Sequence, residues 1–493
     1  MSYVPRHAAT AAHGRVSPSR WRSFSRIGSS GLTALALSAM LPPIARAQRD
    51  SVPPPRTELS TGAAKSSDQL DSLVVEALVR GPKVRAASAR AVASRHRVSA
   101  AAAPPDPMLM LGIQNQPLGR ERGTMSGMPP SAGPDPMTMR MAGVSQTIPF
   151  PGKLALRRRV AEREVESAES AIETARRQIM RDVKQAYYEL AFLDRALEVT
   201  MQSRDVVAAI VRAADARYGS GGSTQSEVIR SRLDATRLAE SASALAEQRR
   251  ATLAGLNALL GRVSDAPVGP PAIPAGIAQL AIPVTQGDIR FVSNALGARV
   301  AGSPLRPLAE LQELAVANNS ELREHQATIA AQAVRVDLAR RDRRPDVDVA
   351  LQYGQRGGGL PDMVSASISI PLPVFARRKQ NALALDAESE LHALQAEHEA
   401  SANALRAQVA SLVADLERQR TQLALLAKAL LPQGRAQLAA STASYQAGKA
   451  ELRDVLEARS ALFTYDVDNA RALTDFAKQL AELERVVGTE VVR

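Results

Sequence analysis

The 493-residue chain contains no cysteine. This absence excludes disulfides, thiolate metal sites, cysteine nucleophiles and an acylated N-terminal cysteine. Aromatic residues make up only 3% of the chain, and the single tryptophan is Trp21. No glycine-rich phosphate loop, nucleophile elbow or acid pair set in a plausible pocket occurs, so the sequence favours neither an enzyme nor a bound cofactor.

Long apolar runs are also scarce. A transmembrane helix needs about 20 consecutive apolar residues, and no segment after residue 47 comes close to that length. If the chain crosses a membrane, β-strands must therefore do so.

Residues 1–47 predict a secretory signal peptide. They combine a basic leader, a short apolar core at Leu32–Leu41 and the small-x-small site Ala45–Ala47. This leader holds six arginines and no carboxylate, so removing it lowers the formal charge from +12 to +6. The remaining basic residues alternate with acids along helical stretches, a pattern typical of solvated helix faces, and no nucleic-acid partner is expected.

The second half of the chain repeats landmarks of the first half in the same order. The matching segments are 76–85 with 314–323, Pro105-Asp106 with Pro345-Asp346, and 148–151 with 370–373. A fourth set matches Tyr218, Gly221, Glu227 and Arg232 with Tyr445, Gly448, Asp454 and Arg459. This order predicts a duplicated unit of helix, two strands and a long helical hairpin.

The predicted organisation has six parts. They are a signal peptide (1–47), a flexible segment (48–65), a first repeat (66–263), a Pro/Gly-rich connector (264–307), a second repeat (308–488) and a C-terminal tail (489–493).

Heptad spacing predicts a long coiled-coil helix over residues 154–217. Its first row is Ile172, Ile179, Ala186 and Leu193, and its second is Val183, Leu190 and Leu197. At about 1.5 Å per residue such a helix spans close to 100 Å. A soluble coiled-coil rod would show the same heptads.

Period-two alternation predicts strands over residues 346–354 and 364–370, each with one apolar and one largely polar face. This pattern suits a strand between lipid and water, and equally a half-buried soluble strand. The chain has only four such strands, too few to close a water-filled barrel. If the strands cross a membrane, several protomers must share one barrel.

Residues 70–488 resemble the TolC-type outer-membrane efflux proteins. The most specific matches are Gln146–Lys153, the Pro-Asp strand starts, and Tyr445–Gly448 running into Asp454–Ala458. The Pro-Phe-Pro-Gly-Lys form of the first match is more similar to the heavy-metal efflux branch than to the drug branch.

The resemblance implies a mainly α fold with β membrane strands. In it a homotrimer forms a 12-stranded β-barrel in the outer membrane, and an α-helical coiled-coil tunnel continues the barrel into the periplasm. The implied partners are a periplasmic adaptor (membrane fusion) protein, an inner-membrane pump of the resistance-nodulation-division type, and outer-membrane lipid.

The implied function is that of a passive conduit for heavy-metal cations. Two alternatives remain open at this point: a drug or small-molecule channel of the same family, and a periplasmic coiled-coil adaptor or structural protein.

Candidate gate residues lie where each long helix turns back. Asp454 and Glu457 are three apart, so they share a helix face. By resemblance they occupy the constriction of the periplasmic gate, with Glu227 as the first-repeat counterpart and Tyr445 at a latch position. The family often has a basic residue where Ala450 stands, so Lys449 or Arg453 would substitute. Alternatively, these acids are ordinary first-turn carboxylates favoured by the helix dipole.

Methionines are the other candidates, because seven of the twelve lie between residues 108 and 141. Thioethers suit soft cations such as Cu(I) and Ag(I). By register with the second repeat, Met108, Met110, Met139 and Met141 face the lumen, in two pairs near opposite ends of their strands. Apolar filler is the competing interpretation. His392 and His398, six apart, fit surface positions.

Overall fold

The computed structural model describes residues 59–115, 138–222, 224–282, 289–292, 297–300, 303–356, 360–489 and 491–492. These residues belong to one compact unit, Thr57–Arg493. The predicted signal peptide, most of the segment 48–65, and Met125, Met128 and Met137 lie outside the described residues.

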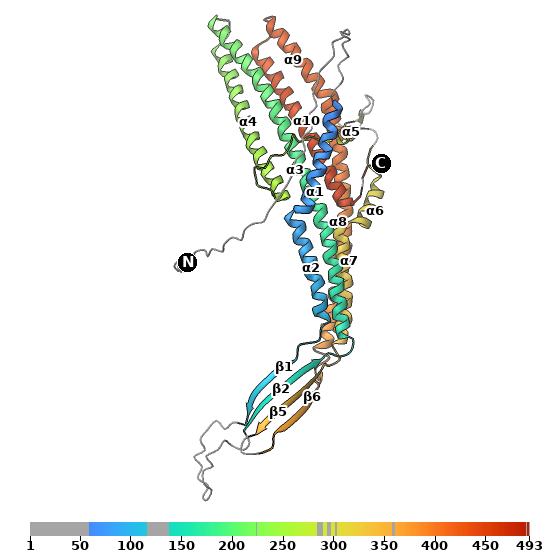
Figure 1. Cartoon of the computed structure of the whole chain (residues 1–493). Coiled ribbons are helices and arrows are strands. Elements are labelled where there is room, and N and C mark those ends of the chain that lie inside the picture. The colour runs from blue at the N-terminus through green and yellow to red at the C-terminus, as the bar shows by residue number, and fades with distance from the viewer. Residues whose placement is uncertain are drawn as a thin grey trace, which may run out of the picture. The chain divides into compact units, whose positions relative to one another are not determined.

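The elements follow each other in a duplicated order (Figure 1). The helices are α1 (Leu59–Arg80), α2 (Pro82–Ala102), α3 (Lys153–Gly219), α4 (Gln225–Leu260), α5 (Ala275–Ala281), α6 (Leu308–Asn318), α7 (Ser320–Arg341), α8 (Gln380–Leu425), the π-helical turn η1 (Leu426–Leu430), α9 (Leu431–Gln446) and α10 (Leu452–Val487). The strands are β1 (Met108–Gln114), β2 (Met139–Ile148), β3 (Ile289–Val292), β4 (Gly297–Val300), β5 (Val347–Arg356) and β6 (Met363–Ser369).

Helix lengths confirm the duplication. α3 has 67 residues, and α8, η1 and α9 cover the same length in consecutive pieces of 46, 5 and 16 residues. α4 and α10 both have 36 residues. The second long helix contains a π-helical turn because Pro432 has no N–H to donate to the preceding turn and its ring clashes there. The first long helix has no proline at the matching place and stays regular.

The strands of both repeats form one antiparallel sheet in the order β1-β2-β5-β6. Direct pairs such as Val144↔Leu351 project to the same side. That side is apolar and exposed: Leu111 is 74% and Ile368 is 71% accessible. The opposite side carries Gln352 and the serines of β6, so the predicted alternation is confirmed.

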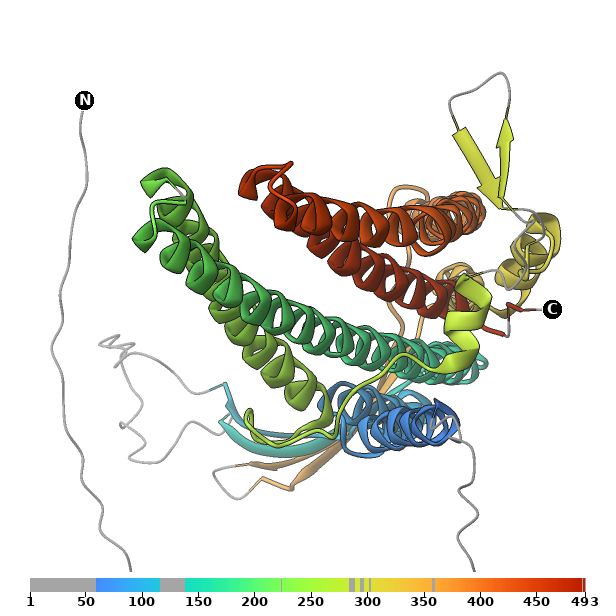
Figure 2. The same cartoon turned by 90° about the horizontal axis from the view of Figure 1, so that it is seen from above.

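α3 lies at the centre of the helical part and packs against α1, α2, α4, α7 and α10. Its heptad rows are buried at Ile179, Val183, Leu190 and Leu193, and half-buried at the other predicted positions. α10 belongs to both large apolar clusters, because Ala477 lies in the cluster around α3 and Phe476 in the cluster around α8. Figure 2 shows the α3/α4 pair and the α9/α10 pair side by side.

A polar cluster reinforces the contact between α3 and α10. Glu189 of α3 accepts hydrogen bonds from Lys478 and, at 3.0 Å, from Arg471 of α10. Burial favours the neutral acid, but the hydrogen bonds and positive charges of Lys478 and Arg471 outweigh it and lower the pKa of Glu189. The Arg471 guanidinium also lies 3.7 Å from the Phe192 ring centroid.

The connector between the repeats contains regular structure that its irregular sequence did not indicate. α5 begins after Pro274, and its residue Ala281 is buried in the apolar cluster around α8. Arg420 of α8 donates from Nε to the Leu280 carbonyl at 3.0 Å. Tertiary packing therefore orders a seven-residue helix too short to show a sequence period.

The Pro-Phe-Pro-Gly-Lys motif joins the sheet to the helices. Lys153 is only 4% exposed, and its ammonium lies 2.8 Å from Asp346 and 3.3 Å from Asp342. Asp346 also accepts the Phe150 N–H at 2.9 Å. Gly152 has φ of 93°, and a Cβ there would lie 2.6 Å from the Arg341 guanidinium. The start of α3 is thus held against the start of β5, in the other repeat.

Replacing Lys153 by methionine should lower the free energy of unfolding by about 2 kcal/mol, because the partly buried Asp346 and the more exposed Asp342 both lose their cation. Thermal unfolding followed by far-UV circular dichroism would measure the change. Lys83→Met is the matched control, since Lys83 is 61% exposed and meets Asp182 at 3.4 Å. Its expected cost is below about 0.5 kcal/mol. Equal losses of stability in the two variants would contradict a stabilising role for the buried Lys153.

Glu189 should contribute pH-dependent stability. Its lowered pKa means that the contribution is complete above the unfolded-state pKa of about 4.3 and is lost as pH falls through the folded-state pKa. Wild type and Glu189→Gln should therefore differ most near neutral pH and converge in acid. A constant difference in melting temperature at every pH would argue against the ionic interaction.

Candidate functional site

The two helical hairpins reverse in turns of the same design. Gly221 and Gly448 adopt φ of 75° and 70°, the left-handed region that glycine enters freely. The N–H of Gly222 and the N–H of Lys449 each donate back to the preceding helix, at 2.8 and 2.9 Å. This is the Schellman arrangement at a helix end. The sequence predicts these turns at Tyr218–Ser223 and Tyr445–Lys449, and of the first turn Ser223 lies outside the described residues.

The two turns differ in how the following helix begins. Thr224 caps α4, because its hydroxyl accepts the Glu227 N–H at 3.4 Å. Glu451, at the matching position before α10, makes no side-chain cap. Glu227 therefore lies in the first turn of a capped helix, as its counterpart Asp454 lies in the first turn of α10.

Apolar contacts join the two hairpin ends. Ala214, Val228, Leu452 and Leu456 form a small buried cluster from both repeats, with Ile210 and Tyr445 packed against it. The Arg217 guanidinium of α3 lies 4.8 Å from the centroid of the Tyr445 ring. Tyr445, the residue expected at the latch, thus touches both hairpins.

The predicted acids lie close to arginines. Glu457 is 3.5 Å from Arg230 of α4 and 3.6 Å from Arg453 of its own helix. Arg453 also lies 3.9 Å from Asp454. The two side chains of the acid pair are 44% and 60% exposed. Exposed pairs of this kind are worth about 0–1 kcal/mol each, so they tune the local charge more than they hold the hairpins.

Arg230 and Arg217 were missed by the sequence reasoning. Arg230 follows Glu227 by three residues, as Glu457 follows Asp454, so the two repeats carry opposite charges at one matching position. That inversion was the available signal. Of the two basic residues proposed to replace the one missing at Ala450, Arg453 contacts the acids, and Lys449 donates its backbone N–H to Ser444.

The sheet methionines lie on its polar side. Met141 pairs with Gly354, and Gly143, two residues further on, pairs with Gln352. Met108 and Met139 lie at opposite ends of their strand pair. Met110 and Met141, however, are diagonal neighbours across β1 and β2. Residues in that position in an antiparallel pair are about 7–8 Å apart.

Met363 joins this group from the second repeat. It pairs with Gly354, whose other partner is Met141. A Cβ on Gly354 would lie 3.7 Å from Met139 Sδ. Three thioethers, two from β2 and one from β6, therefore surround one glycine of β5. Met363 was not among the residues predicted from the sequence, because only the sheet order brings it beside the first repeat.

Histidines also come together across helices. The rings of His325 on α7 and His398 on α8 stand edge to face with centroids 6.4 Å apart. His392 is exposed. Within the described part of the chain, no group of three or more His, Cys, Asp or Glu side chains could hold a metal ion.

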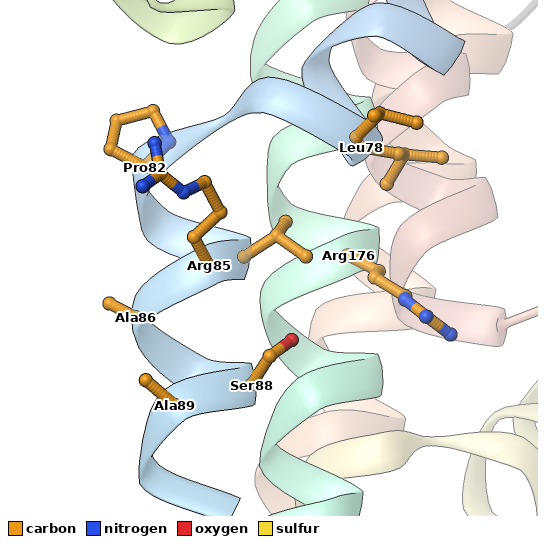
Figure 3. Close-up of a pocket in the computed structure, with 9 residues that line it drawn as sticks. Leu78, Pro82, Arg85, Ala86, Ser88, Ala89 and Arg176 are labelled. Atoms are coloured by element: carbon orange, nitrogen blue, oxygen red, sulfur yellow. The ribbon is translucent and has the colours of Figure 1, made fainter. Parts of the chain in front are cut away.

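A hollow of about 690 Å³ lies where α1 bends into α2 at Pro82. Figure 3 shows Arg85, Ala86 and Ala89 on α2, with Arg176 on the neighbouring α3. Arg176 is paired with Glu173 at 2.5 Å. The lining offers small side chains and guanidinium groups in place of convergent acid-base chemistry.

In the described residues, no helix is both long and apolar enough to span a bilayer.

Comparison with protein families matches residues 73–262 and 311–489 to "Outer membrane efflux protein". The chain belongs to the outer membrane efflux protein family. The two matched segments lie on the two structural repeats, and the family confirms both the efflux-channel function and the outer-membrane location expected from the sequence.

Individual relatives support this membership. The chain is 24% identical over 343 residues to the cobalt-zinc-cadmium resistance protein CzcC of Cupriavidus metallidurans, covering 68% of this chain and 74% of the relative. The structure of CusC has a TM-score of 0.67 at 15% identity, covering 86% of this chain and 92% of CusC. VceC of Vibrio cholerae has a TM-score of 0.63 at 19% identity, covering 87% and 98%. These likenesses confirm the channel-tunnel fold.

Proposed function

We propose that this efflux channel exports heavy-metal cations as the outer-membrane part of a tripartite system. Its partners are a periplasmic adaptor and an inner-membrane pump of the resistance-nodulation-division type, which supplies the energy. The observation that carries the metal assignment is the likeness to the cobalt-zinc-cadmium resistance protein over 68% of the chain.

The channel works as a homotrimer. Edge strands β1 and β6 present unpaired backbone groups, and the apolar side of the sheet is exposed at Leu109, Leu111 and Ile368. In lipid, unpaired N–H and C=O groups cost several kcal/mol each. Pairing β1 of one copy with β6 of the next removes both edges and leaves the apolar side to lipid.

The hairpin ends form the periplasmic gate and the docking end for the adaptor. Three copies of Asp454 and Glu457 create a negative constriction that attracts cations, with Glu227 contributing from the first repeat. Arg230 and Arg453 offset part of that charge, since both lie within 3.6 Å of Glu457. Tyr445 acts as a latch, because movement of either hairpin disturbs its contacts in the joint cluster.

The methionines of the polar side provide weak contacts for soft cations along the passage through the sheet. Met108, Met110, Met139 and Met141 contribute from the first repeat, and Met363 extends the set. Arg356 pairs with Met139 and places a positive charge nearby. Such a charge weakens cation binding, which suits a conduit because tight binding would stop release.

The gate assignment predicts opposite effects of acid and arginine substitutions. Asp454→Asn with Glu457→Gln removes six carboxylates per trimer and should weaken block by a divalent cation on the order of tenfold. Arg230→Gln should strengthen the block. Single-channel recordings in planar bilayers would measure both.

Glu247→Gln serves as the matched control, because Glu247 is an exposed acid of α4 paired with Arg250, outside the hairpin turn. It should leave the block unchanged. If the acid variant and the control behave alike, the gate lies elsewhere.

The methionine contacts predict a selective loss of tolerance. Cells that depend on the channel should tolerate less silver or copper when Met108, Met110, Met139 and Met141 are replaced by leucine, because leucine keeps the volume but has no thioether. Met201→Leu on α3 is the control, being an exposed methionine outside the sheet. Unchanged growth in graded silver, at equal amounts of channel, would eliminate these contacts.

A further inference from the structure

The two junctions between sheet and long helix differ, although they occupy matching places in the repeats. Residues 149–152 connect β2 to α3, a link of four residues. Residues 370–379 connect β6 to α8, a link of ten. The six additional residues are not needed to reverse the chain or to start the helix, because the four-residue link leads directly into α3, which is as long as α8, η1 and α9 together.

The longer junction exposes large apolar side chains. Leu372 is 80%, Val374 is 79% and Phe375 is 73% accessible. Its backbone is nevertheless ordered by turns, since Ala376 N–H donates to the Pro373 carbonyl and Lys379 N–H to the Phe375 carbonyl, both at 3.0 Å. Adjacent exposed apolar side chains on an ordered backbone indicate a surface that is covered by a partner.

Three basic residues follow directly. Arg377, Arg378 and Lys379 are exposed, and none has an ion-pair partner among the described residues. The first junction is different, because its cation Lys153 is buried between Asp342 and Asp346. The second junction therefore carries exposed positive charge that the described residues do not neutralise, and an anionic partner would complement it.

The order of these groups matches a membrane interface. The exposed apolar side of the sheet, ending at Ile370, leads into Leu372, Val374 and Phe375 and then into the three cations. Figure 1 shows this junction where β6 meets the helices. An apolar layer followed by phosphate is the sequence of chemistry met on leaving a bilayer, and interfacial segments pair apolar anchors with Lys and Arg in that way.

We propose that residues 372–379 bind the anionic glycerophospholipids of the periplasmic leaflet, a role that rests on the proposed position of the channel in the outer membrane. Leu372, Val374 and Phe375 enter the acyl region, and Arg377, Arg378 and Lys379 bind lipid phosphates. Through these contacts the segment anchors the sheet end of α8 to the bilayer surface non-covalently. A second copy of the chain is the competing occupant.

The test uses the full chain, assembled in a neutral detergent and titrated with short-chain phosphatidylglycerol or phosphatidylcholine. Bound lipid is counted by native mass spectrometry. Wild type should bind phosphatidylglycerol more tightly, and added salt should weaken this binding. Arg377→Gln, Arg378→Gln and Lys379→Gln together should weaken it roughly fivefold per charge, on the order of a hundredfold in all.

The matched control removes three exposed arginines of the helical hairpins, as Arg237→Gln, Arg250→Gln and Arg418→Gln, and should keep the preference for phosphatidylglycerol. Leu372→Ser, Val374→Ser and Phe375→Ser together should weaken binding of both lipids. Should the basic variant fail to fold, the salt dependence of the wild type still decides: salt-independent binding overturns the proposal.

Two further outcomes overturn it. One is unchanged phosphatidylglycerol binding by the basic variant. The other is separation of that variant into single chains without lipid, which would assign the segment to contact between copies. Channel recordings on the wild type test the proposed function separately: absent conductance sinks the function itself, whereas normal conductance with no lipid preference sinks only the lipid site.

Discussion

Burial of the apolar seam of α3 is the interaction on which the other elements depend. A helix of 67 residues cannot be held by its own hydrogen bonds in one position, because most helical stability in proteins comes from packing an apolar face. Ile179, Tyr187 and Leu190 are buried against α1, α4 and α10. Each such side chain contributes about 1.5–3 kcal/mol, well above the 0–1 kcal/mol of an exposed ion pair. The seam therefore decides where both hairpins lie.

Polar contacts along the same helix determine its register. At the sheet end, Lys153 meets Asp342 and Asp346 of the second repeat. Near the middle, Glu189 holds α10, and at the turn Arg217 stacks on Tyr445. Sliding α3 by one turn would break all of these contacts at once. One continuous element thus links the strands to the hairpin ends, which is what a conduit needs if its gate is to stay aligned with its membrane part.

The two repeats agree in backbone and differ in charge. Helix lengths and the left-handed glycines of the turns are shared. The differences fall at the two ends of the repeats. At the hairpin end, the first repeat has Arg230 where the second has Glu457. At the sheet end, Lys153 of the first repeat is neutralised by carboxylates, whereas residues 377–379 of the second repeat have no ion-pair partner among the described residues. Duplication supplied the architecture, and divergence of side chains at its two ends gave one copy features that the other lacks.

The sequence alone determined those features that depend on neighbours along the chain. Heptads located the seam of α3 to within a few residues, alternation located β5 and β6, and glycines located both turns. The family resemblance added the assembly and the gate positions, because motifs such as residues 146–153 are long enough to be specific.

Only the tertiary structure decided which side chains meet across the repeats. The pairing of Arg230 with Glu457 joins residues more than 200 positions apart, as does the approach of Met363 to Met141. The burial of Lys153 and the exposure of Phe375 likewise depend on how the repeats pack. Local periodicity carries no information on the register between distant segments. That register is set by the fit of buried surfaces, which exists only once the chain has folded.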